Sequence, residues 1–252
     1  MATLLIGTSG WTYASWKGRF YPKDLPARRY LEYYTNEFST TEVNCSFYQL
    51  PSPETFAKWA AQVPDQFIFS VKASRFITHI KRLGMVEEAW SNFVANALKL
   101  GSHLGPILLQ FPQMFRYDLH RLKAFLEQAR VENGRSLRLV FEFRHESWFK
   151  TSVYEVLRRH DAALCIADSS RYPRRRVVTT DFVYLRFHGP ARLFGSSYPL
   201  AQLAAEARQI ARWLKAGLAV YAYFNNDALG HAVVNAKTLR NLIKTDDTEE
   251  IL

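Results

Sequence analysis

Three pairs of polar residues follow apolar runs at a spacing of two: Glu42 with Asn44, Glu142 with Arg144, and Arg186 with His188. In an extended strand, residues i and i+2 point to the same side, so each pair shares one face. The pairs combine carboxylates and an imidazole, which exchange protons, with guanidinium groups, which hold anions. Their types and spacing therefore predict acid–base chemistry on an anionic or phosphorylated substrate.

We expect Glu42, Glu142 and His188 to be the catalytic residues. Two carboxylates in different environments can differ in pKa, so that one acts as the acid and the other as the base. A histidine titrates near neutral pH and suits proton transfer. The expected reaction is of the hydrolase or isomerase/lyase type. A glycosidase, which also uses two carboxylates, is a lesser variant.

Polar and aromatic residues near the ends of apolar runs are expected to bind the substrate: Trp11, Asn44, Lys72, His79, Arg144, Trp148, Asp168, Arg186, Asn225 and Asn226. The cations among them would hold the anion, and arginine suits two-point contacts. An alternative is a structural network, because buried charges require partners. In that network arginines neutralise the strand-end carboxylates: Arg144 and Arg186 with Glu42, Glu142 and Asp168.

Acidic and histidine side chains at the strand ends are also candidate metal ligands: Glu42, Glu142, Asp168, His79 and His188. Their spacing is poor for zinc, because His145-Glu146 is not followed by the second histidine of H-E-x-x-H and there is no cysteine cluster. A carboxylate-rich magnesium or manganese site is less excluded. We assign no metal, and the cofactor stays unknown. Neither a P-loop nor a G-x-S-x-G motif is present.

The net charge of +10 favours acidic partners. Four arginines beside an aromatic residue offer phosphate contacts: Arg171, Arg174, Arg175 and Arg176. Nucleic-acid binding is therefore an alternative function, with an endonuclease-like barrel as its catalytic form. A non-catalytic barrel that binds a ligand is a further alternative.

Cysteine usage and the N-terminal segment bear on the compartment. Cys45 and Cys165 lie in strand-like contexts and form no Cys-x-x-Cys pair, which argues for a reducing compartment. The N-terminal segment enters a strand directly, without a signal-peptide pattern, and no apolar run is long enough to span a membrane. We therefore expect a cytoplasmic protein that does not contact membranes.

Eight apolar runs alternate with helical patterns and are predicted to be strands: 4–7, 41–44, 67–72, 106–111, 137–143, 163–167, 182–187 and 219–224. This alternation predicts an α/β fold, and eight units in 252 residues match a (β/α)8 TIM barrel, whose active site lies at the C-terminal strand ends. We expect a single domain over 1–244, a polar acidic tail over 245–252 and an irregular arginine-rich loop over 169–181. A doubly wound sheet is the alternative, but the first turn lacks G-x-G-x-x-G.

Six ordered motifs carry a resemblance to a known family: Ile6-Gly7-Thr8-Ser9-Gly10-Trp11 with Trp16-x-Gly-x-Phe-Tyr-Pro, Glu42-Val43-Asn44-x-x-Phe-Tyr, the run from Lys72 to His79, Glu142-Phe-Arg144-x-x-x-Trp148, Arg186-Phe-His188-Gly189, and Phe224-Asn225-Asn226. Together they resemble the YecE-like family, domain of unknown function 72, over almost the whole chain. The resemblance implies a TIM barrel of xylose-isomerase-like shape, a group that includes zinc-dependent abasic-site endonucleases. It implies no established activity.

Overall fold

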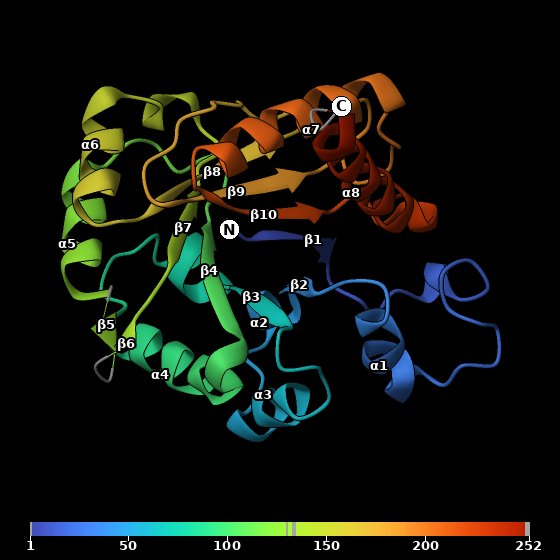
Figure 1. The fold of residues 1–252 in the computed structure, drawn as a ribbon. Helices are drawn as coiled ribbons and strands as arrows, with labels where there is room; N and C mark the ends of the chain where they lie inside the picture. Colours follow the sequence, from blue (N-terminus) through green and yellow to red (C-terminus); the bar gives the residue numbers. More distant parts are fainter. Residues whose placement is uncertain (1, 130, 133–134, 250–252) are drawn as a thin grey trace. The chain divides into compact units, whose positions relative to one another are not determined.

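The strands of the barrel lie where the sequence predicts them. The computed structural model of the protein describes residues 2–129, 131–132 and 135–249 (Figure 1). Within these residues, eight strands close into a barrel in the order β1-β10-β9-β8-β7-β4-β3-β2. Their bounds are β1 (Leu4–Ser9), β2 (Thr40–Val43), β3 (Ile68–Lys72), β4 (Leu104–Gln110), β7 (Leu139–Glu142), β8 (Ala163–Asp168), β9 (Phe182–Phe187) and β10 (Ala219–Phe224). The TIM-barrel prediction is confirmed.

Contacts within the chain define two compact units. The first unit comprises residues 1–41, 166–174 and 181–252, and the second comprises 42–165 and 175–180. The first holds β1, β9 and β10, whereas β3, β4 and β7 belong to the second. The single domain expected over 1–244 stays a prediction.

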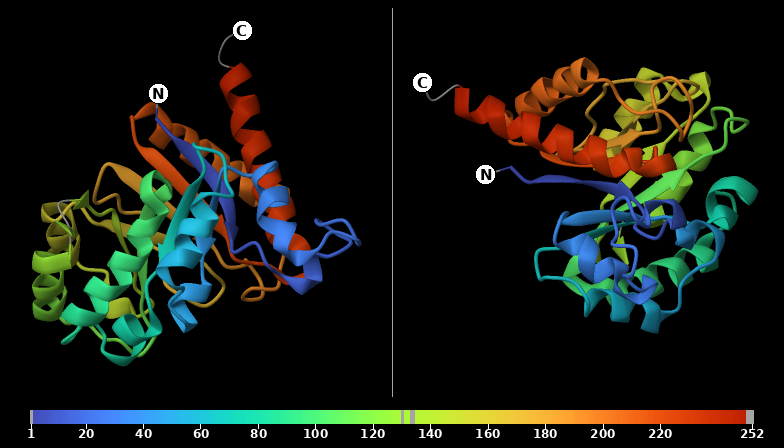
Figure 2. Two further views of the ribbon diagram at one scale, coloured as in Figure 1. Left: turned by 90° about the horizontal axis from the view of Figure 1, so that it is seen from below. Right: turned by 90° about the vertical axis from the view of Figure 1, so that its right-hand side faces the viewer.

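Two long helices cover the strands of the first unit. β10 pairs in parallel with both β1 and β9, with Tyr221 opposite Leu5 on one side and Tyr184 on the other. α7 (Leu200–Lys215) and α8 (His231–Glu249) pack on each other, and α8 also contacts β1 and β10 (Figure 2). The helix α8 continues into the predicted tail, and residues 250–252 lie outside the described part of the chain.

Aromatic packing joins the shorter segments of the first unit. These segments are η1 (Ala14–Trp16), η2 (Ala27–Arg29), α1 (Tyr30–Thr35) and η6 (Ala228–Gly230). Tyr21 stacks on Tyr30 with ring centroids 3.9 Å apart. The buried Trp16 donates its Nε1 hydrogen to the main-chain oxygen of Asp227 at 3.0 Å. This bond fixes the segment that follows β10 against the first loop of the chain.

The second unit surrounds the parallel strands β3, β4 and β7 with helices. The strands bury apolar side chains such as Phe69, Ile107 and Phe141 completely. The helical segments are α2 (Cys45–Tyr48), α3 (Pro53–Ala60), α4 (Glu87–Ala97), η4 (Leu98–His103), α5 (Leu119–Ala129), η5 (Glu146–Trp148) and α6 (Thr151–Arg159). An unpredicted antiparallel pair, β5 (Val131–Glu132) with β6 (Arg135–Ser136), precedes β7.

The chain turns into a short helix directly after β2. Cys45 is the first residue of α2 and is exposed, so its predicted strand-like context is wrong, whereas Cys165 is buried in β8 as expected. The Ser46 hydroxyl donates to the main-chain oxygen of Lys72 at 2.6 Å. The same hydroxyl lies 3.3 Å from the main-chain oxygen of Val43, three residues earlier, and a local hydrogen bond of this kind favours a turn over continued extended structure.

A π-helical turn, η3 (Phe76–Ile80), follows β3. The main-chain NH of Lys81 donates to the oxygen of Phe76 at 2.9 Å, five residues earlier, which defines the wide turn. The main-chain NH of Phe76 donates to the Ser74 hydroxyl at 3.1 Å and fixes its start. Turns of this kind are rare and occur often at functional sites.

The segment 169–181 contains neither helix nor strand, as predicted for the arginine-rich loop. A serine at its start organises its first turn, because the Ser169 hydroxyl accepts from the main-chain NH groups of Arg171 at 3.0 Å and Tyr172 at 3.2 Å. In the described part of the chain, no helix is both long and apolar enough to cross a bilayer.

Candidate functional site

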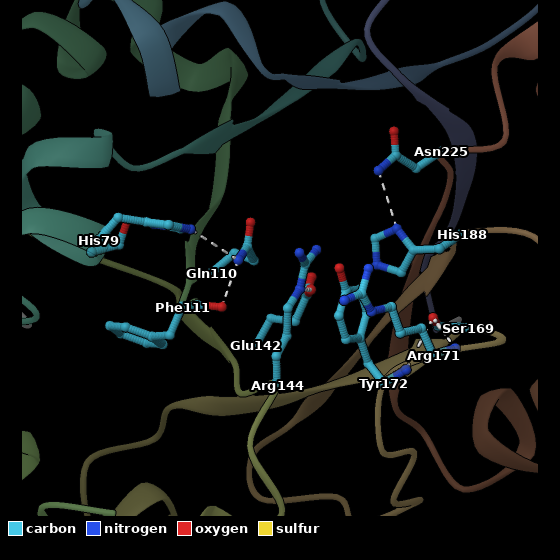
Figure 3. Close-up of polar contacts among 11 residues, drawn as sticks. His79, Gln110, Phe111, Glu142, Arg144, Ser169, Arg171, Tyr172, His188 and Asn225 are labelled. Atoms are coloured by element: carbon cyan, nitrogen blue, oxygen red, sulfur yellow. Dashed lines mark hydrogen bonds and ion pairs between the residues drawn. The ribbon is translucent and has the colours of Figure 1, made fainter. Parts of the chain in front are cut away.

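A buried ion pair lies at the C-terminal end of β7. The Glu142 side chain is fully buried, and Arg144 donates from Nε to its Oε1 at 2.7 Å. Figure 3 shows the two side chains next to each other. The predicted shared face of this pair is confirmed. A guanidinium in direct contact holds the carboxylate in place and compensates part of its charge.

The second predicted pair follows the same geometry at the end of β2. Glu42 is fully buried, and Asn44 donates from Nδ2 to its Oε1 at 3.3 Å. The shared face of these residues is therefore also confirmed. Both glutamates belong to the second unit, where each has a polar neighbour two residues later.

His79 projects from the π-helical turn η3, and its hydrogen bonds define its tautomer. The Thr78 hydroxyl donates to the main-chain oxygen of Ser74 at 3.1 Å, so it accepts the hydrogen of His79 Nδ1 at 2.9 Å. His79 Nε2 then carries the lone pair, and it lies 3.5 Å from Nε2 of Gln110 (Figure 3). Gln110 is held by a second bond, which it donates to the oxygen of Phe111 at 2.6 Å.

The surroundings of His79 are electropositive. Burial lowers the pKa of His79, and the charges of Lys72, Arg144 and Arg75 lower it further, to about 4. Glu142 raises the pKa but does not offset these effects. His79 is therefore neutral at pH 7. We call Lys72, Arg75, His79, Glu142 and Arg144 the cation cluster.

Lys72 ends β3 and extends over an aromatic ring. Its Nζ atom lies 4.0 Å from the centroid of the Phe47 ring. The edge of the same ring faces His79, with centroids 4.8 Å apart and planes at 81°. A cation over an aromatic face is attracted to the ring quadrupole, so Phe47 helps to position the ammonium group.

In the first unit, the buried His188 and the half-buried Asn225 form a hydrogen-bonded pair after β9 and β10. Asn225 Nδ2 donates to His188 Nδ1 at 3.1 Å, which places the hydrogen of the neutral ring on Nε2 (Figure 3). The His188 ring is fully buried and meets the rings of Tyr172 and Phe194 edge to face. The pair is rigid and suited to a defined tautomer.

Asp168 is committed to a network inside the first unit. Its Oδ1 accepts from the Tyr198 hydroxyl at 2.7 Å, and its Oδ2 accepts from Arg174. Arg174 also donates to Glu206 at 2.6 Å. Burial raises the pKa of Tyr198, and the charge of Asp168 raises it further. For Asp168 these contacts match the structural-network alternative, with Arg174 as a partner that the sequence did not indicate.

Asp227 is a carboxyl that sequence reasoning did not include in the site. Burial raises its pKa from 3.8 to about 6, although Tyr13 and Arg186 act in the opposite direction. Its Oδ1 is buried and has no hydrogen-bond partner among the described residues. Arg186, which the sequence places at the same strand-end level, is 1% exposed. The missed signal was the position of Asp227, three residues after β10.

Three residues that the sequence predicts to contact the ligand are buried in the protein. Trp148 is fully buried, stacks on Phe143 at 4.2 Å and donates to the main-chain oxygen of Phe115 at 2.7 Å. Asn226 is fully buried and donates to Ser196 and Asn235, each at 2.9 Å. Trp11 is 9% exposed. In all these contacts Trp148 and Asn226 have protein partners, and their predicted contact with a ligand stays a prediction.

Two arginines of the segment 169–181 have carboxylate partners. Arg174 bonds to Asp168 and Glu206, as described above, and Arg175 forms an ion pair with Glu146. Arg171 and Arg176 are exposed. Contacts with carboxylates compete with contacts to phosphates, and the predicted binding of nucleic acid by this segment stays a prediction.

The candidate metal ligands do not form a centre. Among the described residues, no three His, Cys, Asp or Glu side chains gather in a way that would hold a metal ion. Asp168 already has both carboxylate oxygens engaged. The residues present therefore do not fit the zinc site of the endonuclease-type barrels.

A closed parallel barrel with buried acid–base groups at its strand ends defines the class as a (β/α)8 TIM barrel. Within this class, the chain belongs to the family described as protein of unknown function DUF72, whose family model matches residues 5–250. The resemblance to the YecE-like family is thereby confirmed. The family description carries no activity, so the site has to be interpreted from its own geometry.

Two curated relatives match part of the chain. The UPF0759 protein YunF of Bacillus subtilis (strain 168) is 27% identical over 158 residues, which cover 60% of this chain and 54% of YunF. The UPF0759 protein YecE of Escherichia coli (strain K12) is 30% identical over 120 residues, which cover 47% of this chain and 43% of YecE. The match thus spans about half the length of these relatives.

Solved structures share the fold over most of the chain. A DUF72 family protein from Thermotoga maritima MSB8 has a TM-score of 0.85 and 28% identity, covering 96% of this chain and 99% of that chain. A xylose isomerase-like TIM barrel protein from Mycobacterium smegmatis, in complex with magnesium, has a TM-score of 0.54 and 14% identity, covering 88% and 90%. The second likeness shows the TIM-barrel fold alone.

Proposed function

We propose that this chain is an enzyme of the hydrolase or isomerase/lyase type that acts on an anionic or phosphorylated small molecule. The supporting observation is the cation cluster of the second unit, where Lys72, Arg75 and Arg144 surround a neutral His79. The three cations outnumber the two carboxylates that this unit buries at its strand ends, Glu42 and Glu142, so an added anion is favoured. Phosphate and carboxylate groups match the donors of lysine and arginine.

Proton transfer is assigned to the groups whose proton positions are defined by hydrogen bonds. Glu142 accepts from Arg144, which favours its ionised form, so it serves as the general base. His79 offers the lone pair of Nε2. Glu42 and His188 stay proposed proton carriers, the latter with its hydrogen on Nε2.

Calorimetric titration with inorganic phosphate and ribose 5-phosphate tests the anion site. We expect binding by the wild type and a loss of about tenfold in affinity for Lys72→Gln, as for a charge-assisted contact. The matched control is Lys99→Gln, which removes the same charge from an exposed position of the same unit. Its affinity should stay within about twofold of wild type. Equal losses in both variants, or no binding by the wild type, contradict the proposal.

Nucleic-acid binding through the segment 169–181 stays the alternative partner proposal. Two observations support this alternative: the net charge of +10 and the exposure of Arg171 and Arg176. Binding of a duplex by these arginines would weaken steeply between low and moderate salt, because each phosphate contact releases counterions. Binding of the small anion should depend on salt far less.

A further inference from the structure

A tyrosine beside the cation cluster is almost fully exposed. Tyr48 ends α2, and its side chain is 81% exposed. Tyrosine has an apolar ring with a polar tip, and it is a frequent contact residue where a planar partner binds. This ring is therefore available to a ligand that the cation cluster holds.

The position of Tyr48 relative to Lys72 is fixed by two contacts. The hydroxyl of Ser46 donates to the main-chain oxygen of Lys72 at 2.6 Å, which attaches α2 to the end of β3. The Phe47 ring lies between the two side chains, 4.0 Å from Lys72 Nζ and 5.0 Å from the Tyr48 ring, with the two rings at 89°. The centroid of the Tyr48 ring therefore lies at most about 9 Å from Lys72 Nζ, because both lie close to the same Phe47 ring.

A second exposed aromatic ring lies on the turn that carries His79. Phe76 starts the π-helical turn that carries His79 and is 42% exposed, with Lys81 Nζ 5.6 Å from its ring. Arg75 precedes it and is exposed. Aromatic rings interleaved with cations match a ligand that carries both planar groups and phosphates.

The segment that follows this turn in the sequence has energetically unfavourable backbone conformations. Three non-glycine residues adopt left-handed conformations, with φ of 49° at Arg82, 69° at Leu83 and 47° at Met85. Such conformations persist where surrounding structure enforces them, and they cluster at ligand-binding sites. The chain thus adopts unfavourable backbone conformations directly after the turn that carries Phe76 and His79.

We propose that the anionic ligand is a nucleoside phosphate unit, either a free nucleotide or part of a single-stranded nucleic acid. This inference rests on the proposed function. The cation cluster binds the phosphate, and the base stacks on Tyr48. In a nucleotide a single ribose separates these groups, a span of the same order as the separation of Lys72 from Tyr48. Stacking on an exposed ring accepts any base, so the surface selects the class rather than one nucleotide.

Calorimetric titration of the full chain with adenosine 5′-monophosphate, ribose 5-phosphate and inorganic phosphate tests the inference. The wild type should bind the nucleotide about tenfold more tightly than ribose 5-phosphate, in line with one stacked base. Tyr48→Ala should reduce this advantage to less than about twofold and leave phosphate affinity unchanged, whereas Tyr48→Phe should keep it. Leu200→Ala, at an exposed apolar residue of α7, is the control that should behave as wild type.

The outcomes separate the two proposals. If phosphate binds in a Lys72-dependent way but the nucleotide has no advantage, or the advantage survives Tyr48→Ala, the stacking inference is overturned and the anion site stands. If none of the three ligands binds the wild type, the anion site itself is overturned. A six-residue oligodeoxyadenylate that binds more than about tenfold tighter than the nucleotide identifies a single strand as the source, and equal affinity identifies the free nucleotide.

Discussion

At the scale of single residues, the buried carboxyls differ in how their charge is compensated. Glu142 has the Arg144 guanidinium at 2.7 Å, and Asp168 has Tyr198 and Arg174. Asp227 is different, because one of its oxygens is buried without a hydrogen-bond partner among the described residues. The same residue type can therefore be a structural anchor or a titrating group, according to its immediate neighbours.

Glu142→Gln separates a catalytic role from a structural one. Glutamine keeps an acceptor for Arg144 Nε, so we expect the free energy of unfolding to fall by about 1 kcal/mol or less. Turnover of an anionic substrate should be abolished, because the general base is lost. Chemical denaturation and a turnover assay measure the two effects. Unfolding of the variant would instead identify Glu142 as part of a structural network.

Arg144→Ala leaves the buried Glu142 carboxylate without this contact. The variant should have a free energy of unfolding about 3 kcal/mol lower than that of the wild type.

Asp227→Asn should stabilise the protein at neutral pH. The folded-state pKa of about 6 lies above the ordinary value of 3.8 for an aspartate, so the folded state disfavours the ionised form. The contribution of Asp227 to stability is therefore greatest below pH 4, falls between pH 4 and 6, and stays low above pH 6. Asparagine resembles the protonated form, so the stabilisation should be on the order of 2 kcal/mol at pH 8 and vanish near pH 4.

Chemical denaturation of wild type and Asp227→Asn across pH 4–8 measures this difference. A stabilisation that is the same at every pH would show that Asp227 does not titrate in this range. Asp24→Asn makes the same substitution at a carboxyl that is exposed in the first loop, and it serves as the control variant.

At the scale of elements, two short helical segments position the cation cluster. α2 attaches to β3 through Ser46, and η3 carries His79 on a π-helical turn. α2 follows β2 and η3 follows β3 within a few residues. The strands of the barrel therefore hold the side chains of these two segments in defined positions. The binding surface consequently depends on local hydrogen bonds as much as on the barrel.

Ser46→Ala tests this dependence. Loss of the bond to the Lys72 main-chain oxygen should lower the free energy of unfolding by about 1 kcal/mol, and anion affinity should fall because Phe47 and Lys72 are less well positioned. Thermal denaturation and calorimetric titration measure the two quantities. Ser102→Ala, at an exposed serine of η4, should change neither. Wild-type affinity in Ser46→Ala would mean that α2 does not position the cluster.

At the scale of the whole molecule, the sequence predicts the fold well because its signals are periodic. Apolar runs alternate with helical stripes, and this pattern predicts all eight barrel strands of the described chain within two residues. The shared faces of Glu42 with Asn44 and of Glu142 with Arg144 follow from the alternation along a strand. Local rules of this kind require no knowledge of tertiary contacts.

Features that depend on tertiary contacts were not predictable in the same way. Arg174 pairs with Asp168 and with Glu206, which lie 6 and 32 positions away in the sequence, and no local pattern indicates these pairs. The raised pKa of Asp227 results from burial, which sequence spacing does not reveal. The helix α2 is too short to show a periodic stripe.

The two cysteines differ in a way that has a practical use. Cys165 is buried in β8, whereas Cys45 is exposed at the start of α2, three residues before Tyr48. A thiol-reactive fluorophore would therefore attach at one known point without any substitution. Partial burial raises the pKa of the Cys45 thiol, so mildly alkaline labelling is appropriate. The labelled chain would serve as an optical sensor with which compound collections are screened for the unknown ligand.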